Sequence, residues 1–116
     1  DNERAELYNR ARTLVEEEKL YLNERLRLRD VAAKMNVPDY LLSQIINDVA
    51  GRSFTELINL YRVDEVKARL ASPSFANLTV EAIGSDSGFS SKASFYAAFK
   101  RHTGITPKEY RQKLSK

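Results

Sequence analysis

Hydrophobic residues recur every three or four positions along almost the whole of this chain, and strict alternation over the length of a strand is hard to find. This period predicts amphipathic helices. The expected helices cover residues 3–22, 29–35, 39–50, 53–70, a short segment from Thr79, 92–103 and a last segment from Thr106 to Leu114. The pattern therefore predicts an all-α protein of about seven helices.

The expected helices also carry recognisable ends. Gly51 and Gly104 each follow a helix, and glycine suits the left-handed conformation that closes one. Ser53 and Glu56 have the spacing of a capping box, and the same spacing recurs from Thr106. The residues expected to face the core in the helices before the two glycines are Leu42, Ile45, Ile46, Val49, Phe95, Ala98 and Phe99.

The chain contains an internal repeat. A shift by about half the length, with one residue gained in the turn, brings apolar and glycine positions of the two halves into register. The coinciding pairs include Val31 with Ile83, Ala32 with Gly84, Leu42 with Phe95, and Gly51 with Gly104. Each half holds a short helix, a turn, a second helix and a capped third helix, which is the spacing of a helix-turn-helix unit. A helical bundle whose repeat reflects core formation alone is the alternative.

We expect four segments along the chain. They are an amphipathic but peripheral helix at 1–26, a first helix-turn-helix at 27–52, a long linker helix at 53–71, and a second helix-turn-helix with a C-terminal helix at 72–116. In such motifs the second helix lies in the major groove of DNA, and two units about 34 Å apart reach one face of the duplex. Duplication would then replace dimerisation, so we expect the isolated domain to be monomeric.

Composition narrows the chemistry. The 116 residues suit one domain or two very small ones rather than a large enzyme core. Because there is no cysteine and His102 is the single histidine, we expect no metal site and no cofactor. Because the sequence has no catalytic motif, we also expect no enzymatic activity. No apolar run approaches the roughly 20 residues of a membrane helix, and the start of the chain does not resemble a signal peptide. We therefore expect a cytoplasmic protein.

The charge is uneven along the sequence. Residues 1–26 hold five basic and seven acidic residues, whereas residues 27–116 hold fourteen basic and nine acidic ones. From Gly88 onward, seven basic residues accompany the single acid Glu109. Such a stretch is typical of a surface that meets a polyanion, and equally of an ordinary solvated surface. Charge alone leaves both interpretations open.

The most specific pattern lies in the second half. The sequence GFSSKASFYAAFKR at 88–101, followed by GITPKEYR at 104–111, resembles the C-terminal signature of the AraC/XylS family of bacterial transcription regulators. The first half resembles the same family through Asp30-Val31-Ala32, Leu42-Ser43, Gly51, Ser53-Phe54 and Tyr61-Arg62. The resemblance covers residues 26–111 and implies a DNA-binding domain with two helix-turn-helix subdomains.

The resemblance also implies which side chains contact DNA. The base-reading residues would lie near the start of each second helix, at Tyr40, Ser43, Gln44 and Asn47 in the first unit and at Ser91, Lys92, Ala93, Tyr96 and Ala97 in the second. The residues expected to bind phosphates are Arg52, Lys100 and Arg101. Phosphate contacts fix register without reading sequence, so these three would set affinity.

Five positions depart from the family pattern. Gln44 and Ala97 stand where an arginine is usual, which weakens guanine readout. Asn47 and Asp48 stand where a basic pair is common, and Asp48 would be repelled by a nearby phosphate. Gly84 replaces the usual alanine within a helix, at a cost of about 0.5 to 1 kcal/mol in helix propensity.

Taken with the repeat, the resemblance predicts sequence-specific binding of double-stranded DNA as part of a bacterial transcription regulator. It further implies a separate N-terminal sensor region and RNA polymerase subunits as partners of the full-length regulator, with membrane anchoring through that region left open. A helical protein–protein adaptor that has lost specific DNA readout is the alternative function, favoured by Asp39, Asp48 and the missing arginines.

Overall fold

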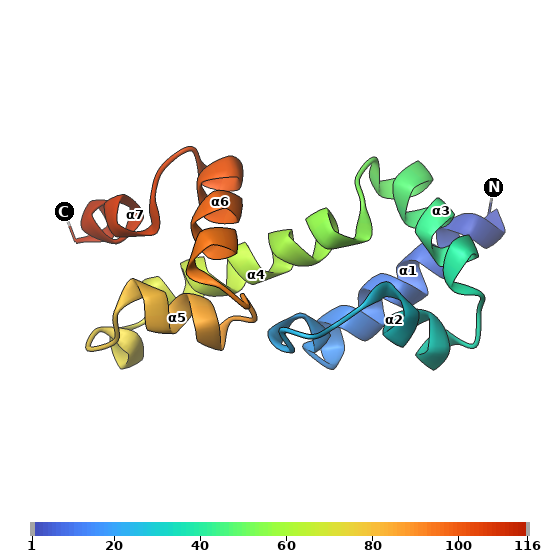
Figure 1. The fold of residues 1–116 in the computed structure, drawn as a ribbon, viewed down its shortest axis with the longest axis horizontal. Helices are drawn as coiled ribbons and strands as arrows, with labels where there is room; N and C mark the ends of the chain where they lie inside the picture. Colours follow the sequence, from blue (N-terminus) through green and yellow to red (C-terminus); the bar gives the residue numbers. More distant parts are fainter. Residues whose placement is uncertain (1, 116) are drawn as a thin grey trace. The chain divides into compact units, whose positions relative to one another are not determined.

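The computed structural model describes residues 2–115 and divides the chain into two compact units, Asp1–Ile58 and Asn59–Lys116. The described residues form seven α-helices and two short 3-10 helices, which confirms the predicted all-α fold (Figure 1). The helices are α1 (Asn2–Glu17), α2 (Leu28–Met35), α3 (Asp39–Ala50), α4 (Phe54–Leu70), α5 (Val80–Asp86), α6 (Lys92–Thr103) and α7 (Pro107–Leu114). The 3-10 helices are η1 (Leu20–Leu22) and η2 (Pro73–Phe75). The division between the units falls inside α4.

The first unit is built from α1, α2 and α3, each of which contacts the other two. Ala11 and Val15 of α1 are buried, so this helix is part of the core. The prediction that it is peripheral was therefore wrong, and the helix ends at Glu17, earlier than expected. Lys19, which follows, adopts a left-handed conformation with φ of 50°.

The second unit is built around aromatic side chains. Its buried residues come from the second part of α4, from α5 and from α6: Val63, Val66, Leu70, Val80, Ile83, Phe89, Phe95, Ala98 and Phe99. The ring of Phe95 lies between those of Phe89 and Phe99, with centroid separations of 5.2 and 6.1 Å. Tyr110 of α7 meets Phe99 edge-on at 5.4 Å, so α7 is joined to the same core.

The turn after α2 and the turn after α5 are closed in the same way. The amide of Val37 donates to the carbonyl of Ala32 at 3.0 Å, and the amide of Phe89 donates to that of Gly84 at 3.2 Å. The residue before each donor has positive φ, 57° at Asn36 and 108° at Gly88. The backbone thus repeats the relation that the sequence repeat indicates.

The predicted helix ends are also present. Gly51 and Gly104 have left-handed φ values of 69° and 84°. Ser53 and Glu56 exchange hydrogen bonds of 3.0 and 3.1 Å, each backbone amide donating to the other's side chain. The same exchange between Thr106 and Glu109 starts α7. These caps fix where α3 ends and α4 begins in the first half, and where α6 ends and α7 begins in the second.

Candidate nucleic-acid interface

The exposed face of α3 carries the predicted base-reading residues of the first unit. Tyr40, Gln44 and Asn47 are exposed, with Tyr40 at 73% of its full accessibility, whereas Ser43 is half-buried. Leu42, Ile45 and Ile46 on the other face are almost completely buried. Because one face is fixed in the core, the polar face projects away from the unit. Val49, which we expected to face the core, is 45% exposed, so that prediction was wrong.

Two polar side chains on α3 already have partners. The side-chain amide of Asn47 donates to the backbone carbonyl of Ser43 at 2.8 Å. The carboxylate of Asp48 accepts a hydrogen bond from the guanidinium of Arg4 in α1. Sequence reasoning had assigned no role to Arg4, because the contact joins helices far apart in the sequence.

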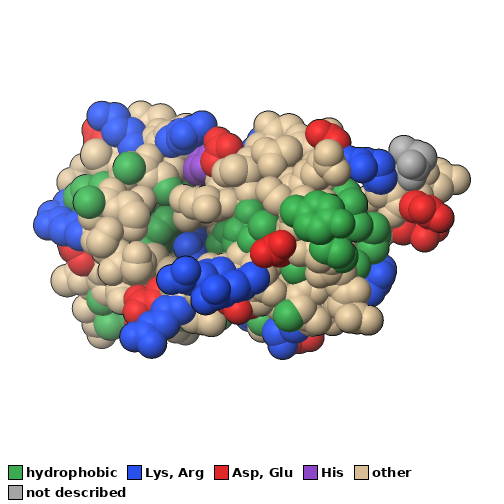
Figure 2. Space-filling view, turned by 45° about the vertical axis from the view of Figure 1, so that its right-hand side comes forward, with side chains coloured by type: hydrophobic (Ala, Val, Ile, Leu, Met, Phe, Trp, Pro, Cys, Tyr) green, Lys and Arg blue, Asp and Glu red, His purple; other side chains and the backbone are tan. Residues whose placement is uncertain are grey.

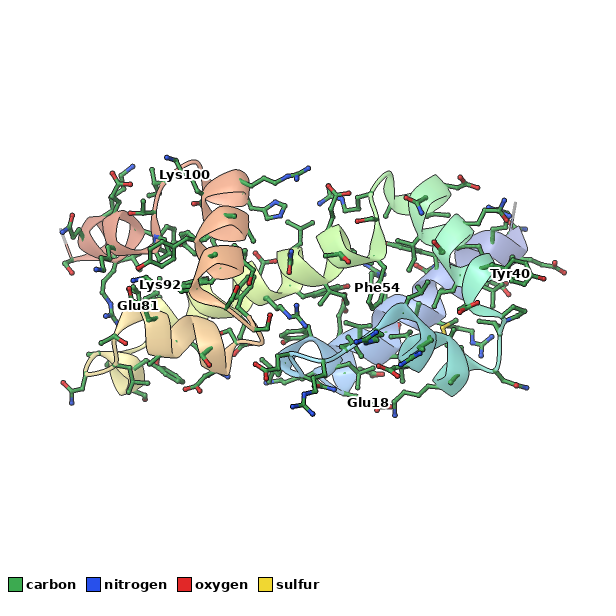
Figure 3. All side chains as sticks on the ribbon, viewed as in Figure 1. Glu18, Tyr40, Phe54, Glu81, Lys92 and Lys100 are labelled. Atoms are coloured by element: carbon green, nitrogen blue, oxygen red, sulfur yellow. The ribbon has the colours of Figure 1, made fainter. Side chains whose placement is uncertain are left out.

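The start of α6 carries the predicted base-reading residues of the second unit. Ser91, Lys92, Ala93 and Ala97 are exposed, and Tyr96 is half-buried. Figure 3 places Lys92 near the beginning of α6 and Lys100 near its end. The neighbouring apolar face of α6 lies in the aromatic core. Like α3, α6 is therefore fixed by a buried apolar face and exposes its opposite face to solvent.

The hydroxyl of Ser91 is used within the protein. It accepts a hydrogen bond from the Ser94 amide at 3.1 Å and donates to the Ser94 hydroxyl at 2.9 Å. Ser91 is thus the N-cap of α6. Base reading by Ser91 stays a prediction, and it would require this hydroxyl to make a third hydrogen bond beside the two to Ser94.

Tyr96 is held by Glu81 of α5. The Tyr96 hydroxyl donates to the Glu81 carboxylate, and the Nζ of Lys108 lies 3.8 Å from the same carboxylate. The Nζ of Lys92 lies 5.5 Å from the centre of the Tyr96 ring, a cation–π distance. Glu81 thus connects α5 with α6 and α7, a role that nothing in the sequence spacing indicated.

This hydrogen bond shifts both titrations. The hydroxyl of Tyr96 stabilises the ionised carboxylate and lowers the pKa of Glu81, helped by a backbone hydrogen bond and by Lys108 and Lys92. The same bond raises the pKa of Tyr96. In α7, the backbone amide of Thr106 is the main cause of a lowered pKa at Glu109.

Glu81→Gln is expected to change the acid sensitivity of the second unit. A carboxyl whose pKa is depressed by folding adds stability above its unfolded pKa of about 4.3, and this stability is lost as pH falls through the lower folded value. The variant should therefore be less stable than the wild type at neutral pH, and the difference should shrink on acidification. Thermal unfolding at a series of pH values tests this. A stability difference between variant and wild type that stays constant from pH 7 to pH 3 would contradict this prediction. Both proteins should still lose some stability in acid, because the pKa of Glu109 is also lowered in each.

The predicted phosphate-binding residues lie at helix ends. Arg52 follows the glycine that ends α3 and is half-buried, whereas Lys100 and Arg101 are exposed in the last turn of α6. Positive charge in a last turn also complements the helix dipole, so these two side chains have a structural use as well. Figure 2 shows Lys and Arg side chains in several groups on the displayed face, with acidic side chains among them.

Within residues 2–115, no group of three or more His, Cys, Asp or Glu side chains could hold a metal ion. None of the helices in that range combines the length and the apolar character needed to cross a membrane.

Comparison with known proteins gives a consistent picture. The family model described as "Helix-turn-helix domain" matches residues 31–113. An uncharacterized HTH-type transcriptional regulator of Staphylococcus aureus (strain MSSA476) is 32% identical over 92 residues, which are 79% of this chain and 12% of that protein. The chain therefore spans only a small part of such relatives.

Solved structures share the fold. The C-terminal domain of AraT, a response regulator from Geobacillus stearothermophilus, superposes with a TM-score of 0.79 at 29% identity, over 92% of this chain and 84% of that one. An AraC-type transcriptional regulator from Chromobacterium violaceum, at 21% identity, gives 0.80 over 100% and 98% of the two chains and supports the fold alone. With two helix-turn-helix units, the family match and these neighbours, the chain belongs to the AraC-type helix-turn-helix family of DNA-binding domains.

Proposed function

We propose that this domain reads double-stranded DNA sequence-specifically by placing α3 and α6 in the major groove, with 27–52 and 72–116 as the two helix-turn-helix subdomains. The observation that carries the proposal is the repeated geometry. Each unit has the same turn hydrogen bond, followed by a helix with a buried apolar face and an exposed face. An α-helix of this kind fits the width of the major groove.

The side chains of α3 suit adenine and thymine. The amides of Gln44 and Asn47 have the donor and acceptor pair that matches the major-groove edge of adenine. Tyr40 offers a ring for a thymine methyl group, and the Ser43 hydroxyl can either donate or accept. Because Asn47 already donates to Ser43, Gln44 is the stronger candidate for a bidentate contact.

The predicted base-reading side chains of α6 differ from one another in the base groups that they can contact. Lys92 can donate to the O6 and N7 acceptors of guanine, while Ala93 and Ala97 can contact only apolar groups such as the thymine methyl. The Tyr96 hydroxyl is already hydrogen-bonded to Glu81. We therefore propose that the Tyr96 ring positions the neighbouring Lys92 ammonium rather than that its hydroxyl bonds to a base. We propose that Arg52, Lys100 and Arg101 bind phosphates and add affinity without sequence preference.

Selection of bound sequences from a random duplex library tests this proposal. We expect two enriched motifs separated by one helical turn, about 10 base pairs, and an affinity that falls steeply with salt. A single enriched motif would leave only one of the two helices as a reader. No enrichment together with salt-independent binding would refute the proposal.

A protein–protein adaptor is the second candidate function. Asp39 and Asp48 on the exposed side of α3 favour it, because carboxylates oppose phosphates. The ion pair of Asp48 with Arg4 weakens this argument by neutralising one of the two charges. An adaptor should bind the random duplex library no better than an unrelated helical protein of equal net charge.

We infer four further properties, one of the isolated domain and three of the parent protein. The domain is a monomer when isolated, because the internal repeat supplies two reading helices from one chain, and sedimentation velocity without DNA would check this. The full-length regulator carries a sensor region and contacts RNA polymerase subunits. It acts in the cytoplasm, where bacterial DNA is found.

A further inference from the structure

The side chain of Asp48 lies on the same face of α3 as two of the predicted base-reading residues. Tyr40, Gln44 and Asp48 are spaced by four residues along α3 and therefore lie on one face of the helix. The side chain of Asp48 is 59% exposed. If this face enters the major groove, a carboxylate there lies close to phosphates of both strands and opposes binding.

Arg4 of α1 neutralises this charge within the protein. Its guanidinium pairs with the Asp48 carboxylate, and the Arg4 side chain is only 31% exposed, so much of it lies against the unit. An exposed ion pair adds little to folding stability, typically 0–1 kcal/mol. Its effect on a surface that meets DNA is different, because it decides whether that surface carries an uncompensated negative charge.

The position of Arg4 is set by the core of the first unit. Arg4, Ala11 and Val15 share one face of α1, since they are separated by about two and three helical turns. Ala11 and Val15 are buried, which turns this face toward α3. Farther along, the guanidinium of Arg10 donates to the Met35 carbonyl at 3.3 Å, and α1 is thereby also joined to the end of α2.

We propose that Arg4 is a positioning residue that sets the DNA affinity of the first unit by neutralising Asp48 on α3. The inference rests on the proposed DNA-binding function. It makes α1 a working part of the DNA-binding surface, although Arg4 need not contact DNA itself.

A double-mutant cycle tests the inference. The probe is the duplex selected from the random library, and the proteins are the wild type, Arg4→Ala, Asp48→Asn and the double variant. Arg4→Ala should weaken binding about threefold to tenfold, as one uncompensated charge near phosphates would. Asp48→Asn should bind at least as tightly as the wild type. In the Asp48→Asn background, Arg4→Ala should have no further effect.

Two more variants separate this role from others. Arg12→Ala removes an exposed arginine from the same helix, so it matches the change in net charge and should leave affinity within about twofold of the wild type. Arg4→Lys keeps the charge and should retain most of the affinity. Circular dichroism and thermal unfolding of each variant check that α1 remains folded.

The outcomes distinguish this inference from the function on which it rests. A wild-type protein that shows no salt-dependent binding refutes both. Wild-type binding with an equal loss from Arg4→Ala in both backgrounds overturns only the inference, because Arg4 would then act on DNA directly. An Arg4→Ala loss no larger than that of Arg12→Ala overturns it as well.

Discussion

Gly84→Ala is expected to lower the free energy of unfolding of the second unit by about 2 kcal/mol, within the usual range for an overfilled core. A Cβ atom at this position would lie 2.5 Å from Cδ2 and 2.6 Å from Cε2 of the Phe95 ring. That ring is 1% exposed and has Phe89 and Phe99 as aromatic neighbours, so it has little room to move. The gain in helix propensity from alanine, about 0.5 to 1 kcal/mol, opposes this loss but is smaller than it.

Urea denaturation combined with amide hydrogen exchange measures the effect. Protection should fall in α5 and α6, while α2 and α3 serve as an internal reference. Ser85→Ala is the matched control, because it changes an exposed neighbour in the same helix and should shift stability by less than about 0.5 kcal/mol. Adding Phe95→Leu to Gly84→Ala should destabilise less than the sum of the single changes. Unchanged or increased stability in Gly84→Ala alone would contradict the steric argument.

Replacement of predicted base-reading residues and of predicted phosphate-binding residues should have different consequences. Lys92→Ala and Gln44→Ala should each reduce discrimination at one base position by about 1 to 3 kcal/mol. Arg101→Ala should weaken binding to all duplexes about equally and reduce the slope of log affinity against log salt by about 1. Library selection and salt titration of each variant measure both properties.

The control for this comparison is Arg12→Ala, which removes a basic residue that we assign to neither group. A uniform loss from Lys92→Ala, Gln44→Ala and Arg101→Ala would refute the division between reading and phosphate contacts. Relaxed preference in Arg101→Ala, with an unchanged salt slope, would transfer that residue to the base-reading group.

Much of the fold could be predicted because it depends on local rules. Periodicity located the helices, and glycine and the capping box at Ser53 located their ends. The errors arose where tertiary contacts decide. Val49 has the spacing of a core residue but lies near the end of α3, where it is 45% exposed. The first helix has few strongly apolar residues, yet small Ala11 lets it lie close to its neighbours in the core.

For the candidate site, the exposure of side chains could be predicted from the sequence, but their contacts with other helices could not. Once a helix has one buried face, the exposure of Gln44 or Lys92 on the other follows from its geometry. The partners of Tyr96 and Asp48 did not follow, because each contact joins two different helices and helical spacing relates only residues within one helix. The sequence showed that Gly84 departs from the family pattern. The structure adds the steric reason for a glycine there, because the Phe95 ring lies where a Cβ atom would be.

The attachment of α1 to the first unit has a thermodynamic consequence if Arg4 acts as proposed. Coupling between two equilibria is reciprocal, so a helix whose docking favours DNA binding is itself held more firmly once DNA is bound. Any event that pulls the start of α1 away from Asp48 would then compete with the operator for the same domain. Occupancy of DNA and the docking of α1 would be two readouts of one equilibrium.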